Sequence, residues 1–157
     1  MTRTPSQTVG PFYSIGLCRR TENALVSTGE PNAVELRGRL LDGEGVPIVD
    51  GMIEICDGTR WGRSGTDAEG AFTFLLTKPT AGAGAPHFDV FVFARGLLRH
   101  QLTRVYFPDE THANALDPVL ATLEDARRAT LVAVEQDGGL RFDIRMQGDR
   151  ATVFFEH

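Results

Sequence analysis

Turn-forming residues divide this chain into many short apolar segments, and that division constrains its fold more than any other feature. The 157 residues include 17 glycines and eight prolines, which recur between apolar runs of a few residues. In several runs apolar and polar residues alternate, with the period of a strand that buries one face. The sequence therefore predicts many short strands joined by turns.

The apolar runs give the expected positions of the strands. We expect strands over residues 34–41, 52–56, 63–67, 71–76, 87–94, 101–107, 130–136, 140–146 and 152–155. The segment Asp137-Gly138-Gly139 is typical of a hairpin turn between two of them. In the run after this turn, one face of the strand is apolar and is formed by Leu140, Phe142, Ile144 and Met146.

One helix is expected after Asp117, which can cap it, with Pro118 at its first position. Its apolar face would end near Leu123 and its solvated end near Arg128. The first 32 residues differ from the rest, because their prolines and glycines show little periodicity and are typical of an extended arm. We therefore expect an all-β fold, an antiparallel β-sandwich over residues 33–157 with an N-terminal arm over residues 1–32 and one or two short helices.

Composition and charge exclude several classes of protein. The net charge of −5 lacks the basic excess of a nucleic-acid binder. No apolar run approaches the roughly 18 residues that span a bilayer. The N-terminus has no apolar signal core, and Cys18 and Cys56 lack the spacing of a zinc site. We therefore expect a cytoplasmic protein that binds neither nucleic acid nor a membrane.

Two groups of residues are candidates for chemistry within this chain. His87 and Asp89 project to the same face of a strand, and with His100 they can offer a metal two nitrogens and a carboxylate. The simpler interpretation places His87 at a strand start and Asp89 on a solvent-facing edge. Cys18 is followed by two arginines, whose charge lowers a thiol pKa, but no paired histidine is evident. The residues alone indicate a β-sandwich without a self-sufficient catalytic set.

Motifs between residues 4 and 155 match those of a known family. They are Thr4–Tyr13, Gly38–Gly45, Arg63–Asp67, Pro86–Gly96, Thr103–Phe107, Arg141–Gly148 and Thr152–Phe155. In these motifs the chain resembles the intradiol ring-cleaving dioxygenases, and within them the alpha-type subunits of heteromeric enzymes. The motifs at the two ends are the specific ones, because glycine turns like those in the middle occur in many β-sandwiches.

The resemblance implies a ferric ion, Fe3+, that the beta-type subunit holds with two tyrosines and a His-x-His pair. Here the matching strand reads His87-Phe88-Asp89, so the second histidine is missing. The chain has only Tyr13 and Tyr106, and no tyrosine lies between them where the family has its ligands. The resemblance therefore implies an iron-free subunit with no catalytic residue and no metal ligand of its own.

The resemblance also implies what such a subunit does, which is to wall the active site of an iron-bearing beta subunit. The arm residues Thr8, Gly10 and Pro11 would line the substrate pocket. Arg95 would lie at the pocket mouth and bind the carboxylate of a catechol acid. The complex, a higher hetero-oligomer, would use O2 to open the ring of protocatechuate and give 3-carboxy-cis,cis-muconate.

Two alternatives belong to other classes of function. One is a non-catalytic binding module that kept the sandwich and lost the enzyme partner. The other is a metalloenzyme that uses His87, Asp89 and His100.

The chain departs from the family in one loop. The family's alpha chains have more residues before Arg63 than the short Cys56–Trp61 stretch here, and that stretch is a candidate for an altered partner contact.

Overall fold

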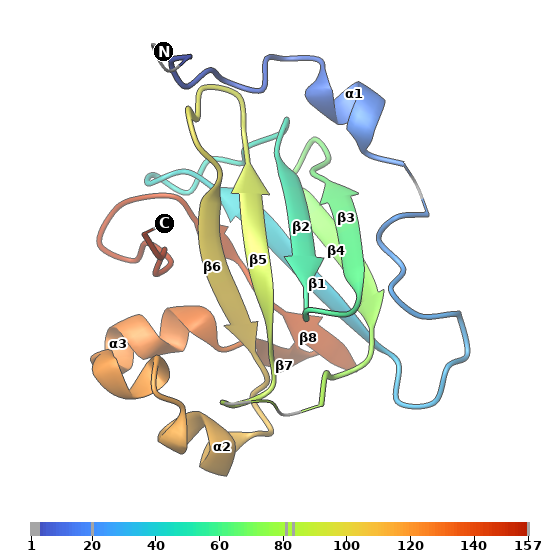
Figure 1. Ribbon diagram of the computed structural model, residues 1–157, viewed down its shortest axis with the longest axis vertical. Helices are drawn as coiled ribbons and strands as arrows, with labels where there is room; N and C mark the ends of the chain where they lie inside the picture. Colours follow the sequence, from blue (N-terminus) through green and yellow to red (C-terminus); the bar gives the residue numbers. More distant parts are fainter. Residues whose placement is uncertain (1–3, 20, 81, 83, 157) are drawn as a thin grey trace.

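The chain folds into two facing β-sheets (Figure 1). The structure is a computed structural model that describes residues 4–19, 21–80, 82 and 84–156. The first sheet has the order β4-β1-β8-β7, with β9 also paired to β1. Its strands are β1 (Val34–Leu41), β4 (Ala71–Leu76), β7 (Val134–Gln136), β8 (Gly139–Arg141) and β9 (Ile144–Arg145). The second sheet, β3-β2-β5-β6, consists of β2 (Met52–Cys56), β3 (Trp61–Gly65), β5 (His87–Phe93) and β6 (Gln101–Tyr106).

The expected all-β sandwich is confirmed, and two parallel pairings are added to the antiparallel ones. β1 pairs antiparallel with β4 on one edge and parallel with β8 and β9 on the other. The parallel pairs arise because a long helical connection, rather than a hairpin, returns the chain from β6 to the first sheet. The second sheet is antiparallel throughout.

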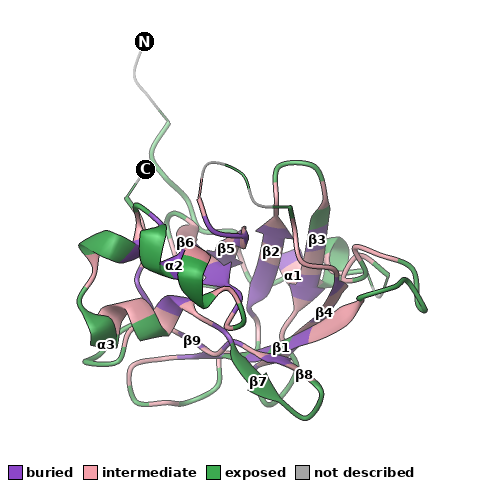
Figure 2. Cartoon of the chain, turned by 90° about the horizontal axis from the view of Figure 1, so that it is seen from below, coloured by how far each residue is buried: buried purple, intermediate pink, exposed green. Residues whose placement is uncertain are grey.

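The core lies between the two sheets, where alternate side chains of each strand face inward (Figure 2). In β5, for example, Phe88, Val90 and Val92 are at most 1% exposed, and the residues between them are half-buried. Leu140, Phe142 and Ile144 are buried and Met146 packs against the same core, as the alternation predicts. A smaller cluster around Tyr106, Leu120 and Leu131 joins the helical connection to β6.

The helices are short and differ from the single helix expected after Asp117. They are α1 (Tyr13–Leu17), α2 (Thr111–Leu116) and α3 (Asp125–Arg128), with 3-10 turns η1 (Leu120–Thr122) and η2 (Ala129–Leu131). Asp117 does act as a cap, because its carboxylate accepts hydrogen bonds from the amides of Val119 and Leu120 at 2.9 and 3.1 Å. The expected helix is nevertheless broken, since Leu123 and Glu124 are extended.

Six of the expected strands differ from the observed ones, and two of these differences are only that β5 and β6 end one residue early. The expected strand 140–146 is divided into β8 and β9, where the Asp143 carboxylate accepts the amide of Arg39 at 3.0 Å in place of a backbone carbonyl. β3 ends at Gly65 rather than residue 67, because the carboxylate of Asp67 accepts the amides of Glu69 and Ala71 and so forms the turn. β7 starts late because η2 occupies residues 129–131. Residues 152–155 form no strand and make only an isolated bridge between Phe155 and Leu102. None of the helices in the described part of the chain has the length and apolar character to cross a bilayer.

The N-terminal residues cover one side of the sandwich (Figure 1). The carbonyl of Glu22 accepts the amide of Arg63 in β3 at 2.8 Å, and that of Asn23 accepts the amide of Leu75 in β4 at 2.9 Å. The segment therefore bridges the edge strands of both sheets, which protects these edges from pairing with other chains. The division of the chain between residues 32 and 33 stays a prediction.

The short β2–β3 turn depends on the carboxylate of Asp57. It accepts the amides of Thr59 and Arg60 at 3.0 and 2.7 Å and forms an ion pair with the Arg60 guanidinium at 2.5 Å. Burial opposes the charge on Asp57, but these hydrogen bonds outweigh it and lower the pKa of Asp57 to about 2. The ionised carboxylate therefore stabilises the folded state above the pKa of an unfolded aspartate.

We predict that Asp57→Asn destabilises the chain at pH 7 by about 2 kcal/mol, the free energy linked to the lowered pKa. The charged Asp57 carboxylate stabilises the fold above about pH 4, and this stabilisation is lost as the pH falls toward 2. The difference in free energy of unfolding between wild type and Asp57→Asn should therefore shrink over this range. Urea unfolding at pH 7, 5 and 3 measures that difference. A difference that stays constant with pH would contradict the role of the charge.

We predict that Gly38→Ala, in β1, destabilises the chain by about 3 kcal/mol through overpacking. A Cβ at this position would lie 1.9 Å from the Phe142 carbonyl oxygen and 2.4 Å from the Phe72 ring. Gly16→Ala is the matched control, because a Cβ there meets nothing within 4 Å. Thermal unfolding compares the two variants, and equal melting temperatures would contradict the packing described for β1.

Candidate functional site

Tyr13 anchors the N-terminal arm to one end of the second sheet. It is the buried residue of α1, at 8% exposed. Its hydroxyl donates to the backbone carbonyl of Asp50 and lies 3.1 Å from the carbonyl oxygen of Phe93. Burial, together with the charge of Asp50, raises the pKa of Tyr13, so the phenol keeps the proton that this hydrogen bond requires. The residues just before Tyr13 are thereby held near the end of β2 and β5.

Arg95 lies at the same end of the sheet. Its Nε atom is 3.1 Å from a carboxylate oxygen of Asp50, and its side chain is 66% exposed. The register explains this pair: β2 and β5 are antiparallel with Met52 opposite Phe93, and two further residues along each strand bring Asp50 opposite Arg95. Asp50 therefore contacts both Tyr13 and Arg95.

An apolar groove of about 460 Å³ lies between the arm and the loop that joins β5 to β6. Its lining residues are Gln7, Val9, Phe93, Ala94, Leu97, Leu98, Arg99 and His100. Thr8 lies between the two arm residues of this lining, and Arg95 directly follows Ala94. We refer to the groove together with Thr8, Gly10, Pro11, Asp50 and Arg95 as the arm site.

The four residues expected to contact substrate thus lie around one end of the sandwich. Thr8 and Pro11 are exposed. Gly10 has a positive φ of 76°, which favours glycine, and a Cβ there would meet nothing within 4 Å. Within this chain the glycine is therefore needed for the turn of the arm rather than for a close contact. Whether these residues contact a substrate stays a prediction.

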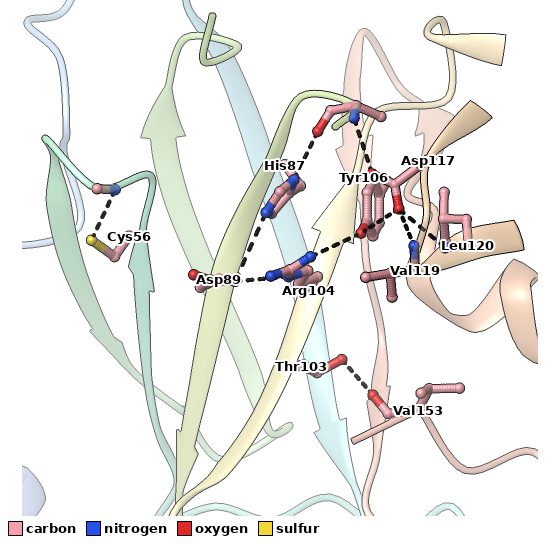
Figure 3. A network of polar contacts seen from close by, with 12 residues as sticks. Cys56, His87, Asp89, Thr103, Arg104, Tyr106, Asp117, Val119, Leu120 and Val153 are labelled. Carbon is pink, nitrogen blue, oxygen red and sulfur yellow. Dashed lines mark hydrogen bonds and ion pairs between the residues drawn. The ribbon is translucent and has the colours of Figure 1, made fainter. Parts of the chain in front are cut away.

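A second polar cluster lies on the outer face of β5 and β6, where the metal alternative had placed His87 and Asp89. Figure 3 shows His87, Asp89, Arg104, Tyr106 and Asp117 linked by polar contacts. The Nδ1 atom of His87 is 2.7 Å from the carbonyl of Ala85, and its Nε2 atom is 3.9 Å from Asp89. Arg104 pairs with the same Asp89 oxygen at 2.9 Å. The guanidinium therefore supplies a positive charge beside the carboxylate.

His100 does not join this cluster. Its ring packs against Phe91 and Phe93, with centroids 5.6 and 5.4 Å apart. Phe91 is four residues from His87 along β5, a separation of about 13 Å. Over the described residues, no group of three His, Cys, Asp or Glu side chains is gathered closely enough to hold a metal ion. The set of His87, Asp89 and His100 is therefore not assembled.

The two tyrosines do not supply the donors that the resemblance implies for a ferric site. Burial raises the pKa of Tyr106 to about 12, with the Arg104 hydrogen bond opposing the rise, and its hydroxyl donates to Asp117 at 3.2 Å. Burial also raises the pKa of Tyr13. Tyr13 lies beside Phe93, whereas Tyr106 pairs opposite His87, six residues away on β5 and thus about 20 Å apart. Because the two phenols lie at different places and no group of three His, Cys, Asp or Glu side chains is gathered among the described residues, the side chains that the structure describes do not fit a ferric ion.

The two cysteines show no sign of a reactive thiol. Burial raises the pKa of Cys18, an effect that Arg63 opposes and that Glu22 and Glu54 add to. A thiol with a raised pKa is mostly protonated at neutral pH and is a poor nucleophile. Cys56 is half-buried, and its sulfur accepts the amide of Gly58 at 3.3 Å (Figure 3).

Sequence reasoning missed Tyr13 and Asp50 as residues of the arm site. The signal for Asp50 was present in the strand pattern, because pairing residues 52–56 with 87–94 allows a register that places Asp50 opposite Arg95. The signal for Tyr13 was weaker. An aromatic residue in an aperiodic arm has no predictable partner until the arm is placed on the sheet.

The chain is similar along almost its whole length to two curated alpha chains. It is 38% identical to the protocatechuate 3,4-dioxygenase alpha chain of Burkholderia cepacia over 193 aligned residues, with 99% of this chain and 98% of that one covered. Identity to the alpha chain of Pseudomonas putida is 35%, with 99% and 97% covered. The aligned lengths exceed the 157 residues of this chain, so the alignments leave gaps in it. No family model matches the chain.

More distant matches are found in sequence and in fold. The B. cepacia protocatechuate 3,4-dioxygenase beta chain is 29% identical, covering 84% of this chain and 72% of that one. The dioxygenase domain of a carbohydrate-binding fusion protein from Streptomyces sp. SirexAA-E superposes with a TM-score of 0.63 at 23% identity, covering 94% and 99%. Hydroxyquinol 1,2-dioxygenase from P. putida gives a TM-score of 0.59 at 16% identity, covering 90% and 65%.

We predict that Tyr13→Phe loosens the arm without unfolding the sandwich. The variant loses the hydrogen bond to Asp50, worth about 1 kcal/mol, so amides of residues 12–18 should exchange with solvent about fivefold faster. Phe12→Leu is the control, because the Phe12 side chain is 75% exposed. Hydrogen exchange by mass spectrometry measures both. Equal protection of the arm in Tyr13→Phe and wild type would show that the hydroxyl does not anchor it.

Proposed function

We propose a function for this chain from one premise: the chain belongs to the protocatechuate 3,4-dioxygenase family, among its alpha chains. Intradiol dioxygenases are generally iron-dependent. We infer that this chain is the iron-free alpha subunit of a heteromeric enzyme, and that a beta-type partner holds the ferric ion. The near end-to-end match to two alpha chains carries this proposal.

The proposed reaction adds both atoms of O2 to protocatechuate and opens its ring between the two hydroxyl-bearing carbons, which gives 3-carboxy-cis,cis-muconate. The ring-opening chemistry belongs to the iron of the partner. This chain ligates no metal in that scheme, in keeping with the pairing of Asp89 with Arg104 at 2.9 Å. Its part is to close the pocket, exclude water and orient the substrate.

The arm is the proposed contact with the partner. Several large apolar side chains of the arm and of the β5–β6 loop are exposed, namely Val9, Phe12, Ile15, Leu17 and Leu98. Exposed apolar side chains that gather at one end of a molecule favour an interaction site. A chain of the beta type is the partner that this family supplies, and one such chain is 29% identical to this one. A higher hetero-oligomer and a cytoplasmic location stay predictions.

Within the pocket, we assign substrate contact to Thr8, Gly10, Pro11 and Arg95. Arg95 is the residue that recognises the substrate carboxylate, because a guanidinium offers five N–H donors in a plane that matches a carboxylate. The side chain is exposed in the isolated chain, so its donors are accessible to a ligand that the partner presents. The apolar groove beside it suits the edge of an aromatic ring.

The proposal predicts that O2 uptake with protocatechuate requires both chains. A beta-type partner should copurify with this chain from its native cell. This chain alone should be inactive, and the copurified complex active.

In the complex, Arg95→Ala should raise KM about tenfold or more with little change in kcat, the loss expected for a charge-assisted hydrogen bond to substrate. Steady-state O2 uptake measures both constants.

Arg150→Ala is the control for loss of an arginine, because Arg150 is exposed and lies in the loop before residue 152. Activity in the chain purified alone would contradict the subunit assignment. If neither preparation is active and no second chain copurifies, a non-catalytic binding module is the better description. An unchanged KM in Arg95→Ala would overturn the role of Arg95.

A further inference from the structure

Asp50 contacts both the arm and Arg95, through its backbone carbonyl and its carboxylate respectively. Its backbone carbonyl accepts the hydroxyl of Tyr13, which holds the arm. Its carboxylate pairs with the Nε atom of Arg95 at 3.1 Å. The arm and the guanidinium are therefore placed relative to each other through one residue.

Asp50 stands on a rigid support. The hydroxyl of Thr66 accepts the amide of Gly51 and donates to the carbonyl of Ile48, both at 2.8 Å, and the amide of Thr66 donates to the carbonyl of Gly51 at 3.0 Å. A Cβ on Gly51 would lie 2.5 Å from the side chain of Leu40, so the backbone here packs closely on the core. Asp50 is thus held on both sides, and its side chain is only 25% exposed.

Arg95 needs such a support, because among the described residues its side chain has an ion pair with Asp50 and no other polar contact that fixes its direction. An exposed arginine side chain populates many rotamers, which a ligand must reduce on binding. A side-on carboxylate takes at most two of the five N–H donors, so at least three stay available to a second carboxylate. Pairing with Asp50 therefore orders the guanidinium while leaving donors for substrate.

We propose that Asp50 is a positioning residue for substrate binding, which orients the Arg95 guanidinium toward the substrate carboxylate and ties that orientation to the arm through Tyr13. This inference rests on the proposed function, because it takes Arg95 as a substrate contact. The inference predicts a change in KM of the opposite sign to the one expected from charge alone. A carboxylate beside Arg95 that only cancelled charge would weaken binding of an anionic substrate, and its removal would then improve KM.

The sign of the KM change tests the inference in the purified complex. Asp50→Ala should raise KM for protocatechuate about twofold to fivefold with kcat changed less than twofold, the effect of losing one orienting ion pair. Asp50→Asn keeps an acceptor for Arg95 and should recover part of the loss. Asp149→Ala removes an exposed acidic side chain elsewhere and should leave both constants unchanged.

A double-mutant cycle shows whether Asp50 acts through Arg95. The variant with both Asp50→Ala and Arg95→Ala should have the KM of Arg95→Ala alone, because a positioning residue has no effect once its target is absent. Additive effects of the two substitutions would overturn the inference. Hydrogen exchange of the arm in the free Asp50→Ala chain should match wild type, since alanine keeps the backbone carbonyl that Tyr13 uses.

The outcomes separate this inference from the proposed function. If Arg95→Ala raises KM but Asp50→Ala lowers it or leaves it unchanged, the positioning role is overturned and the subunit assignment stands. If Arg95→Ala itself has no effect, the assignment of Arg95 to the substrate fails, and the inference about Asp50 fails with it.

Discussion

The arm site depends on the register in which β2 pairs with β5. These two strands form the centre of the second sheet, and their antiparallel pairing places Met52 opposite Phe93. A slip by one residue would turn the inward-facing apolar side chains of one strand to the outer face, so the core enforces this register. The same register brings Asp50 opposite Arg95 beyond the end of the ladder. Packing of the core thus fixes the geometry of a surface site.

The arm site combines rigid strands with an attached arm. The sandwich supplies fixed positions at its end, and Tyr13 attaches an aperiodic segment to them through one buried side chain. On the outer face of β5, Arg104 pairs with Asp89, and His100 packs against Phe91 and Phe93 instead of joining them. In the function proposed above, this chain completes a site whose metal the partner holds.

The sequence predicted the strands well where apolar residues alternate and poorly where other interactions decide. The runs 34–41, 52–56 and 71–76 match their strands, because one face of each is buried in the core. The helix after Asp117 was predicted as one element, yet the chain is extended at Leu123 and Glu124 and restarts as α3. The parallel pairing of β8 with β1 had no local signal, since it depends on the path of a distant connection.

The residues of the arm site were predicted unevenly for a similar reason. Thr8, Gly10, Pro11 and Arg95 came from a resemblance in motifs, and the structure places them around one end of the sandwich. Asp50 lies in none of the matched motifs, and the motif that ends at Tyr13 assigns it no role, because both roles come from tertiary contacts of a backbone carbonyl and of a register position.

The most direct test of this account is a crystal structure of the complex with bound protocatechuate. The account predicts that a nitrogen of the Arg95 guanidinium lies about 2.7–3.2 Å from an oxygen of the substrate carboxylate, the distance of a hydrogen bond. It also predicts that the arm forms part of the pocket wall. A pocket closed entirely by the iron-bearing chain, with Arg95 and the arm away from the substrate, would contradict it.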